Sequence, residues 1–116
     1  MDNYLRLMNE VLILGHESED RTGTGTLSLF GKRLEFDLRQ GFPLVTTKKM
    51  AWKAIKSELL WFIEGSTNER RLAEIHYSQP REVLKDMRTI WTDNYEQQAV
   101  SMGYTEGELG PVYGEQ

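Results

Sequence analysis

The sequence predicts a chain of mixed helices and antiparallel strands, because two different hydropathy patterns occur along it. Apolar residues recur at spacings of three and four over residues 3–14 and 51–64, which is typical of amphipathic helices. Between these segments, apolar and polar residues alternate over residues 27–29 and 34–38, with a Gly-Lys pair between the two runs. Alternating runs separated by turn residues predict two antiparallel strands.

Residues that favour caps and turns predict where the first elements begin and end. Asp2 is expected to cap the first helix, and Gly15 is expected to end it. A polar turn is expected over residues 16–24, before the first strand. Pro43 breaks the chain after the second strand, so residues 43–49 are expected to be extended.

The second half of the chain predicts further helices followed by a loop. Gly65 is expected to end the helix over 51–64, and Ser66 followed by Glu69 has the form of a capping box, which predicts a new helix there. A weaker helical pattern covers residues 91–102 and stops at a glycine. Residues 103–116 contain four glycines and one proline and are expected to form a loop.

The composition favours one folded domain and excludes several classes of protein. The chain has 116 residues, 39% of them hydrophobic, which is enough for a core of its own. It contains no cysteine, and therefore no disulfide framework, thiolate metal site or thiol nucleophile. No apolar run approaches the roughly 20 residues that span a bilayer, and no secretory signal is visible. With a formal net charge of −4, we expect a cytoplasmic protein without membrane or nucleic-acid partners.

Charge is distributed unevenly along the chain. Residues 32–56 carry seven basic and two acidic side chains, whereas residues 89–116 carry five acidic side chains and no basic one. A local basic segment in an acidic protein fits a small anionic ligand. Lys53 and Lys56 are expected to solvate a helix face, while the pair at 48–49 is a candidate for ligand contact.

Glu58 is the most informative single residue for chemistry. On a helical projection of residues 51–64 it falls inside the apolar arc, between Ala54 and Phe62. A carboxylate turned toward a core needs hydrogen-bond partners, or it takes up a proton. Three interpretations stay open: an ion pair with a distant Arg or Lys, a position at the rim of the core, or a functional carboxylate.

Two other segments carry weaker signals. Residues 20–26 combine Arg21 with alternating hydroxyls and two glycines, which suits a phosphate as well as it suits a flexible turn. The two histidines, His16 and His76, lie in no metal-binding motif, so no metal site is expected.

Aromatic and amide side chains that could line a pocket for a flat heterocycle occur at Trp91, Asn94, Tyr95 and Tyr113, although a core role is more common for Trp.

The order and wording of these segments resemble folate-dependent thymidylate synthase. Five motifs carry the resemblance, at residues 20–26, 41–49, 58–68, 90–91 and 107–116. Residues 50–53 and 94–96 resemble the bacteriophage branch of that family more than the common bacterial one. Several long motifs in the right order, covering nearly the whole chain, make accidental similarity very improbable.

The resemblance implies an α+β fold in which a twisted β-sheet packs against helices. It implies that residues 1–116 are the N-terminal portion of a single domain whose C-terminal catalytic portion is absent. The implied reaction is the reductive methylation of dUMP to dTMP, with 5,10-methylenetetrahydrofolate as donor of carbon and hydride and without a metal. A homodimer of the complete enzyme is also implied.

The resemblance also implies roles for individual side chains at matching positions. Glu58 would organise a hydrogen-bonded water network that moves protons near the pyrimidine and the folate, and Tyr113 would help to remove the ring proton. Arg21 would hold the phosphate of dUMP. The folate would be contacted at its glutamate tail by Lys48 and on its pterin side by Ile90, Trp91 and Asn94.

The chain departs from the family pattern in three places and in length. Ala51 stands where many members have a folate-contacting His, Thr92 replaces the usual acid after the Ile-Trp pair, and residues 70–88 follow no family pattern. Family members are more than twice as long. The Pro-Cys-His nucleophile lies in the remainder, and the reaction needs a thiolate. We therefore expect this chain alone to be inactive, with a complementing C-terminal fragment as a candidate partner.

Two other functions stay open on the sequence. A pyrimidine deoxynucleotide hydroxymethylase of the same family would add water where the synthase transfers hydride. A non-catalytic binding or dimerisation remnant would keep the fold without the reaction. The C-terminal portion would distinguish these functions from the synthase.

Overall fold

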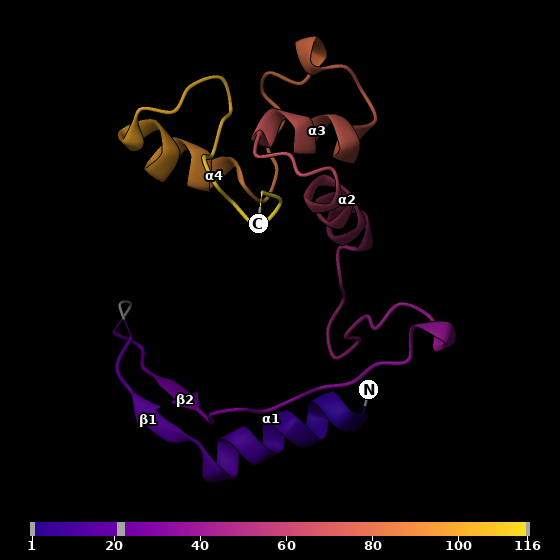
Figure 1. Ribbon diagram of the computed structural model, residues 1–116, viewed down its shortest axis with the longest axis vertical. Helices are drawn as coiled ribbons and strands as arrows, with labels where there is room; N and C mark the ends of the chain where they lie inside the picture. The colour runs from indigo at the N-terminus through magenta and orange to yellow at the C-terminus, as the bar shows by residue number, and fades with distance from the viewer. Residues whose placement is uncertain (1, 21–22, 116) are drawn as a thin grey trace. The chain divides into compact units, whose positions relative to one another are not determined.

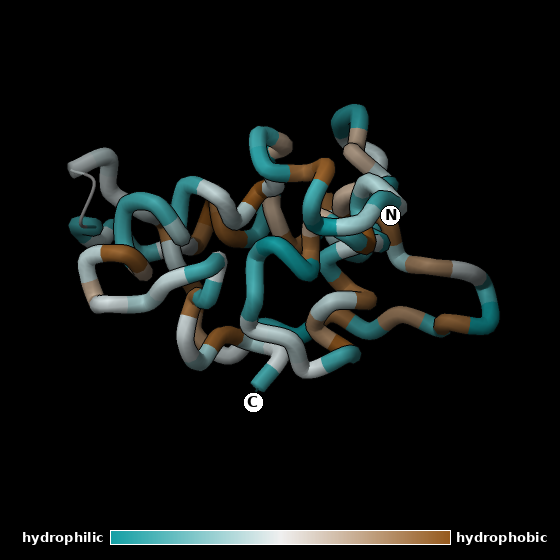
Figure 2. Tube along the Cα trace, turned by 90° about the horizontal axis from the view of Figure 1, so that it is seen from above, coloured by the Kyte–Doolittle hydropathy of each residue, from teal (hydrophilic) through white to brown (hydrophobic). Residues whose placement is uncertain are grey.

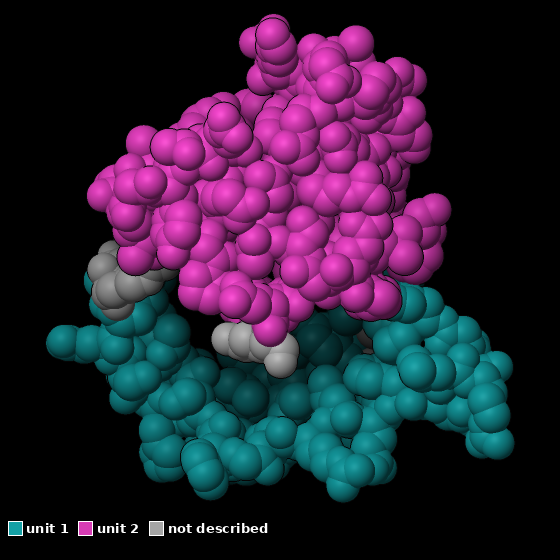
Figure 3. Space-filling model, turned by 45° about the horizontal axis from the view of Figure 1, so that its top comes forward, with its two compact units in different colours: residues 1–50 teal, residues 51–116 magenta. Residues whose placement is uncertain are grey.

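The computed structural model describes residues 2–20 and 23–115 and divides the chain into two compact units. The first unit is Met1–Met50 and the second is Ala51–Gln116 (Figures 1 and 3). Both contain helices, and the first also contains the small sheet, so the mixed helix-and-strand content predicted from the sequence is confirmed. Apolar residues are spread along the whole trace, as Figure 2 shows. No helix in the described ranges is long and apolar enough to cross a membrane.

The first unit opens with helix α1 (Asp2–Leu14), as its hydropathy pattern predicts. The described helix already includes Asp2, so the prediction of Asp2 as the N-cap is wrong. Asp2 instead lies in the first turn, where a negative charge faces the positive end of the helix dipole. The end of the helix is confirmed: the Gly15 amide donates to the carbonyl of Val11 at 2.8 Å, and the chain then leaves the helix.

The strand prediction is correct for one segment and wrong for its partner. Strand β1 (His16–Ser18) pairs antiparallel with β2 (Thr26–Ser28), with Glu17 opposite Leu27. The polar segment 16–24, predicted as a turn, therefore supplies a strand. Hydroxyls rather than apolar side chains meet across this pair, since the Oγ of Ser18 and the Oγ1 of Thr26 are 3.0 Å apart.

The alternating run at 34–38 is not a strand but an extended segment that runs beside α1 (Figure 1). The side-chain amide of Asn3 donates to the Glu35 carbonyl at 3.1 Å, and an ion pair joins Lys32 to Glu10. The run ends in the short 3-10 helix η1 (Leu38–Gln40). Alternation indicates an extended backbone with two different faces, and here the segment pairs with no strand among the described residues, so Phe36 and Leu38 stay 44% and 71% exposed.

The second unit is helical and contains every fully buried residue of the described chain. The predicted helices over 51–64 and 91–102 are confirmed, the second as consecutive α-, π- and 3-10 turns. The elements are α2 (Trp52–Ile63), α3 (Glu69–Tyr77), η2 (Arg81–Val83), α4 (Thr92–Asn94), η3 (Tyr95–Ala99) and η4 (Val100–Met102). Gly65 and Gly103 follow helical segments with φ of 69° and 91°, as expected for glycines at helix ends. The described residues from 104 to 115 form the predicted loop.

The core of this unit contains mostly apolar side chains and one buried serine of α2. Buried apolar side chains are Trp61, Leu72, Ala73, Leu84 and Ala99. Ser57 is also buried, and its hydroxyl donates to the Lys53 carbonyl at 2.7 Å. Ile63, at the end of the same helix, is 73% exposed. Helix α3 packs against α2, and the Trp61 indole donates to the Asn68 carbonyl at 3.0 Å.

Asn68, not Ser66, caps helix α3, so the capping-box prediction is wrong. The Asn68 Oδ1 accepts hydrogen bonds from the amides of Arg70 at 3.0 Å and Arg71 at 3.3 Å. Its Nδ2 donates to the Glu106 carbonyl at 3.1 Å and so also holds the C-terminal loop. Asn is among the best N-cap residues, and here its amide group serves both segments.

We predict that Asn68→Ala destabilises the chain by about 1–2 kcal/mol, the usual cost of losing an N-cap. Urea unfolding followed by circular dichroism measures the change in the free energy of unfolding. Ser66→Ala is the matched variant, because the Ser66 Oγ accepts the weaker 3.3 Å bond from the Asn68 amide. A larger loss for Ser66→Ala than for Asn68→Ala would restore the capping-box interpretation.

Candidate functional site

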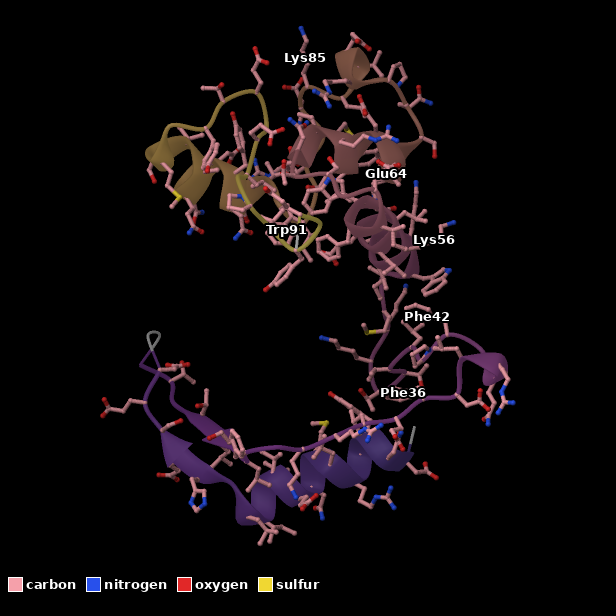
Figure 4. All side chains as sticks on the ribbon, in the orientation of Figure 1. Phe36, Phe42, Lys56, Glu64, Lys85 and Trp91 are labelled. Atoms are coloured by element: carbon pink, nitrogen blue, oxygen red, sulfur yellow. The ribbon has the colours of Figure 1, made fainter. Side chains whose placement is uncertain are left out.

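Helix α2 presents Glu58 to the indole of Trp91, which comes from the segment directly before α4. Both side chains are half-buried, and the indole Nε1 donates to the Glu58 Oε1 at 2.6 Å. Trp91 and Lys56 are labelled on opposite sides of α2 in Figure 4. The partner of Glu58 is thus a neutral donor rather than the Arg or Lys of the ion-pair interpretation.

Trp91 belongs to a group of four aromatic side chains in mutual contact, which we call the aromatic cluster: Trp61, Phe62, Trp91 and Tyr113. The ring centroids of Phe62 and Tyr113 are 5.7 Å apart, and those of Trp91 and Tyr113 are 6.3 Å apart, both with edge-to-face geometry. Such arrangements are the preferred contacts of aromatic rings. Trp61 is fully buried whereas Tyr113 is 67% exposed, so the cluster extends from the core to the surface.

The C-terminal loop brings Tyr113 to this cluster because it is bonded to the turn between α2 and α3. The Glu69 amide donates to the Gly107 carbonyl at 2.7 Å, and the Leu109 amide donates to the Thr67 carbonyl at 3.1 Å. Gly110 has a φ of 75°, and a Cβ there would lie 2.6 Å from the Tyr104 ring. A residue with a side chain would be both strained and too close, which explains a glycine just before the segment that carries Tyr113.

The other residues singled out in the sequence are more dispersed. Ile90 is 69% exposed, and it lines a small cavity of about 110 Å³ together with Ala54 and others. Asn94 is exposed on α4. Lys48 is exposed in the first unit, and Arg21 lies outside the described residues. Within the second unit, therefore, the structure brings Glu58, Trp91 and Tyr113 together.

A buried carboxylate that the sequence did not reveal lies next to this site. Glu69 is fully buried and accepts two hydrogen bonds from the Arg70 guanidinium, from Nε at 2.5 Å and from Nη2 at 2.6 Å. The hydroxyls of Thr89 and Thr92 each donate to its Oε1 at 2.7 Å. The local pattern indicated a capping role for Glu69, and its actual partners lie 20 and 23 residues further along the chain.

Burial raises the pKa of the Glu69 carboxyl, but hydrogen bonds from Arg70, Thr89 and Thr92 outweigh that effect. The pKa of Glu69 is therefore lower than its ordinary value. Thr92, which departs from the family pattern noted in the sequence, is thus used as a hydrogen-bond donor to a carboxylate from another helix.

The part of the chain that the structure describes contains no group of three or more His, Asp or Glu side chains placed to hold a metal ion. Burial, with a smaller contribution from the charge of Lys53, lowers the pKa of His76 from its ordinary value. The aromatic cluster with Glu58 remains the candidate site in this unit. Its half-buried carboxyl group and the exposed ring of Tyr113 suit contact with an organic ligand that has a planar ring.

Comparison with known proteins decides the family. A model of the thymidylate synthase family matches residues 2–116. The chain belongs to the thymidylate synthase family. The family prediction from the five sequence motifs is confirmed, and the α+β fold class with it, because a solved family structure matches the chain closely.

Similar proteins occur in phages and in plants. The probable thymidylate synthase of Escherichia phage T5 is 52% identical over 116 residues, covering all of this chain and 40% of the relative. The bifunctional dihydrofolate reductase-thymidylate synthase 2 of Arabidopsis thaliana is 46% identical over 115 residues, covering 96% of this chain and 18% of the relative. The crystal structure of thymidylate synthase from T4 phage matches with a TM-score of 0.83 at 50% identity, covering 99% of this chain and 39% of that one. The chain thus spans about 40% of the length of its phage relatives.

The lowered pKa of Glu69 predicts how stability depends on pH. A carboxyl with a depressed pKa in the folded state stabilises fully above its unfolded value, here about 4.5, and this contribution is lost as pH falls through the folded pKa. We expect Glu69→Gln to lower the free energy of unfolding at about pH 7. The difference in the free energy of unfolding between the variant and the unchanged chain should become smaller below about pH 4.5.

Urea unfolding across this pH range tests the expectation. Glu64→Gln is the matched control, because Glu64 also pairs with an arginine, Arg71, but on the exposed surface of the same unit. Its effect should be small at every pH, since exposed ion pairs contribute little. If Glu69→Gln lowered the free energy of unfolding by the same amount at every pH, the assignment of an ionised carboxylate at position 69 would be contradicted.

Proposed function

We propose that this chain is the N-terminal portion of a single thymidylate synthase domain that converts dUMP to dTMP. In the proposed reaction, 5,10-methylenetetrahydrofolate is the cosubstrate that supplies carbon and hydride. Membership of the family over residues 2–116 supports the proposal, as do relatives named thymidylate synthase at about 50% identity. The complete enzyme is proposed to be a cytoplasmic homodimer whose remaining length supplies the thiol nucleophile.

The observation that carries the proposal is the hydrogen bond from the Trp91 Nε1 to the Glu58 Oε1 at 2.6 Å. An indole N–H is a neutral donor, and its bond to Oε1 sets the direction in which the Glu58 carboxyl group points. One indole N–H satisfies one oxygen, and the second oxygen of a carboxyl group can bind a water. A half-buried, oriented carboxyl group beside aromatic rings suits proton transfer through water to a planar substrate.

The remaining roles follow the matching positions of the family motifs. Tyr113, at the exposed end of the aromatic cluster, is proposed to assist removal of the proton from the pyrimidine ring. The flat face of Trp91 is proposed to contact the pterin of the folate, with Ile90 and Asn94 beside it. Outside this unit, Lys48 is proposed for the glutamate tail of the folate and Arg21 for the phosphate of dUMP.

A chimera tests the function and the role of Glu58 together. In it, this chain replaces the matching 116 residues of the phage T5 relative, so the remainder of that protein completes the length. We expect the chimera to form dTMP from dUMP. Glu58→Gln should lower kcat by about 100-fold or more while the KM for dUMP changes by less than about threefold, because a proton-transfer group acts on chemical steps.

Glu64→Gln is the matched control for this experiment. Glu64 lies directly after α2 on the exposed surface, and its loss removes one carboxylate without touching the aromatic cluster. Its kcat should stay within about twofold of the parent chimera. Equal turnover in Glu58→Gln and the parent would remove Glu58 from the mechanism, and a folded chimera without turnover would contradict the proposed function.

The 116-residue chain by itself should not release tritium from dUMP labelled at C5. It contains no cysteine, and the covalent intermediate that loosens this hydrogen needs a thiolate nucleophile. Tritium release is measured with the chain alone and with the chimera under the same conditions. Release by the chain alone would overturn the proposed division of roles.

A further inference from the structure

The segment that carries Trp91 is held by two threonine hydroxyls that point at one buried carboxylate. Each hydroxyl has one proton, and in both Thr89 and Thr92 that proton is donated to the Glu69 Oε1. The hydroxyl lone pairs are then left to accept backbone amides. The Thr89 amide donates to the Thr92 Oγ1 at 2.8 Å, and the Trp91 amide donates to the Thr89 Oγ1 at 3.2 Å.

The backbone of Trp91 is consequently fixed on both sides. Its amide is bonded to the Thr89 hydroxyl, and its carbonyl accepts from the Tyr95 amide at 3.0 Å. With both groups bonded, the point from which the Trp91 side chain projects is fixed. From this point the indole Nε1 reaches the carboxyl group of Glu58.

The carboxylate itself is anchored by Arg70 of α3, which also binds the loop that follows α3. The Arg70 guanidinium binds both of its oxygens and also donates from Nη1 to the Leu84 carbonyl at 2.8 Å and from Nη2 to the Met87 carbonyl at 3.0 Å. The same arginine therefore fixes Glu69 and the backbone that leads toward Thr89. A charge-assisted, buried arrangement of this kind is stiff, because every group that moves leaves a polar atom without its partner.

We propose that Glu69 is a positioning residue for the Glu58–Trp91 pair. It acts through the hydroxyls of Thr89 and Thr92, without touching the substrate. The consequence for turnover rests on the proposed function, whereas the effect on the Trp91 indole does not. Glutamine cannot replace it, because its NH2 group donates and would face either the Arg70 guanidinium or the two hydroxyl protons.

The test uses the indole N–H of Trp91 in the 116-residue chain as the reporter. The chain has three tryptophans, so three indole signals are expected in a ¹H–¹⁵N NMR spectrum. In Glu69→Gln we expect the Trp91 indole to shift and to exchange with water about tenfold faster, since local opening becomes easier. The Trp61 indole, bonded to the Asn68 carbonyl at 3.0 Å, is the internal control and should change by less than about twofold.

A second pair of variants keeps the proposal testable if Glu69→Gln does not fold. Thr89→Val removes the hydroxyl that joins Glu69 to the Trp91 amide, and Thr89→Ser keeps it. We expect faster Trp91 exchange in the valine variant and the parent value in the serine variant. Glu64→Gln should leave the Trp91 signal unchanged.

The outcomes distinguish an effect on the position of the Trp91 indole from a general loss of stability in the second unit. An unchanged Trp91 indole in both Glu69→Gln and Thr89→Val overturns the proposal, as does an equal acceleration of Trp61 and Trp91. In the chimera, Thr89→Val should lower kcat while Thr89→Ser restores it. Should the chimera be inactive while the indole behaves as expected, the proposed function fails and the positioning role stands.

Discussion

The ion pair between Glu69 and Arg70 is the interaction on which the candidate site and the segment leading to Trp91 depend. The carboxylate is fully buried, and its charge is balanced by the guanidinium and by two hydroxyl donors. Breaking a buried pair of this kind is costly, because it leaves an uncompensated charge in the interior. Through its other hydrogen bonds, the same pair fixes the segment between α3 and α4, which otherwise has a short 3-10 helix as its regular structure. The candidate site therefore depends on a polar contact rather than on hydrophobic packing alone.

The hydrogen-bond partner of Glu58 is the Trp91 indole, and this partner affects the chemistry available at the candidate site. The Trp91 indole is a neutral donor that binds one carboxyl oxygen, whereas an arginine would add a positive charge beside the group. The aromatic cluster adds further rings next to Trp91. The ion pair between Glu69 and Arg70 lies on the neighbouring helix α3, where it holds the segment that carries Trp91.

The sequence could predict the local features of this chain better than the distant ones. Helices were recognisable because their 3–4 spacing is a property of consecutive residues, and the inward position of Glu58 follows from the same periodicity. The prediction of a strand at 34–38 was wrong, because alternation shows that a segment has an apolar and a polar face. It does not show whether another strand pairs with that segment. Glu69 was assigned a capping role because a capping box is recognised from residues three positions apart. The threonine hydroxyls that bind its carboxylate lie 20 and 23 positions further along the chain, beyond the reach of such a local pattern. The family was predictable because whole motifs, unlike single residues, are specific.

The contact between Thr92 and Glu69 also restricts the order in which substitutions can accumulate. An acid introduced at position 92 would put a second carboxylate beside the first, where the hydroxyl oxygen now lies 2.7 Å from Oε1, and one of the two would have to take up a proton. Loss of the acid at position 69 first would leave the Arg70 guanidinium without its buried counter-charge. Either single step is unfavourable, because each leaves a buried charge without a matching partner. The carboxylate at position 69 therefore favours a hydroxyl donor over an acid at position 92.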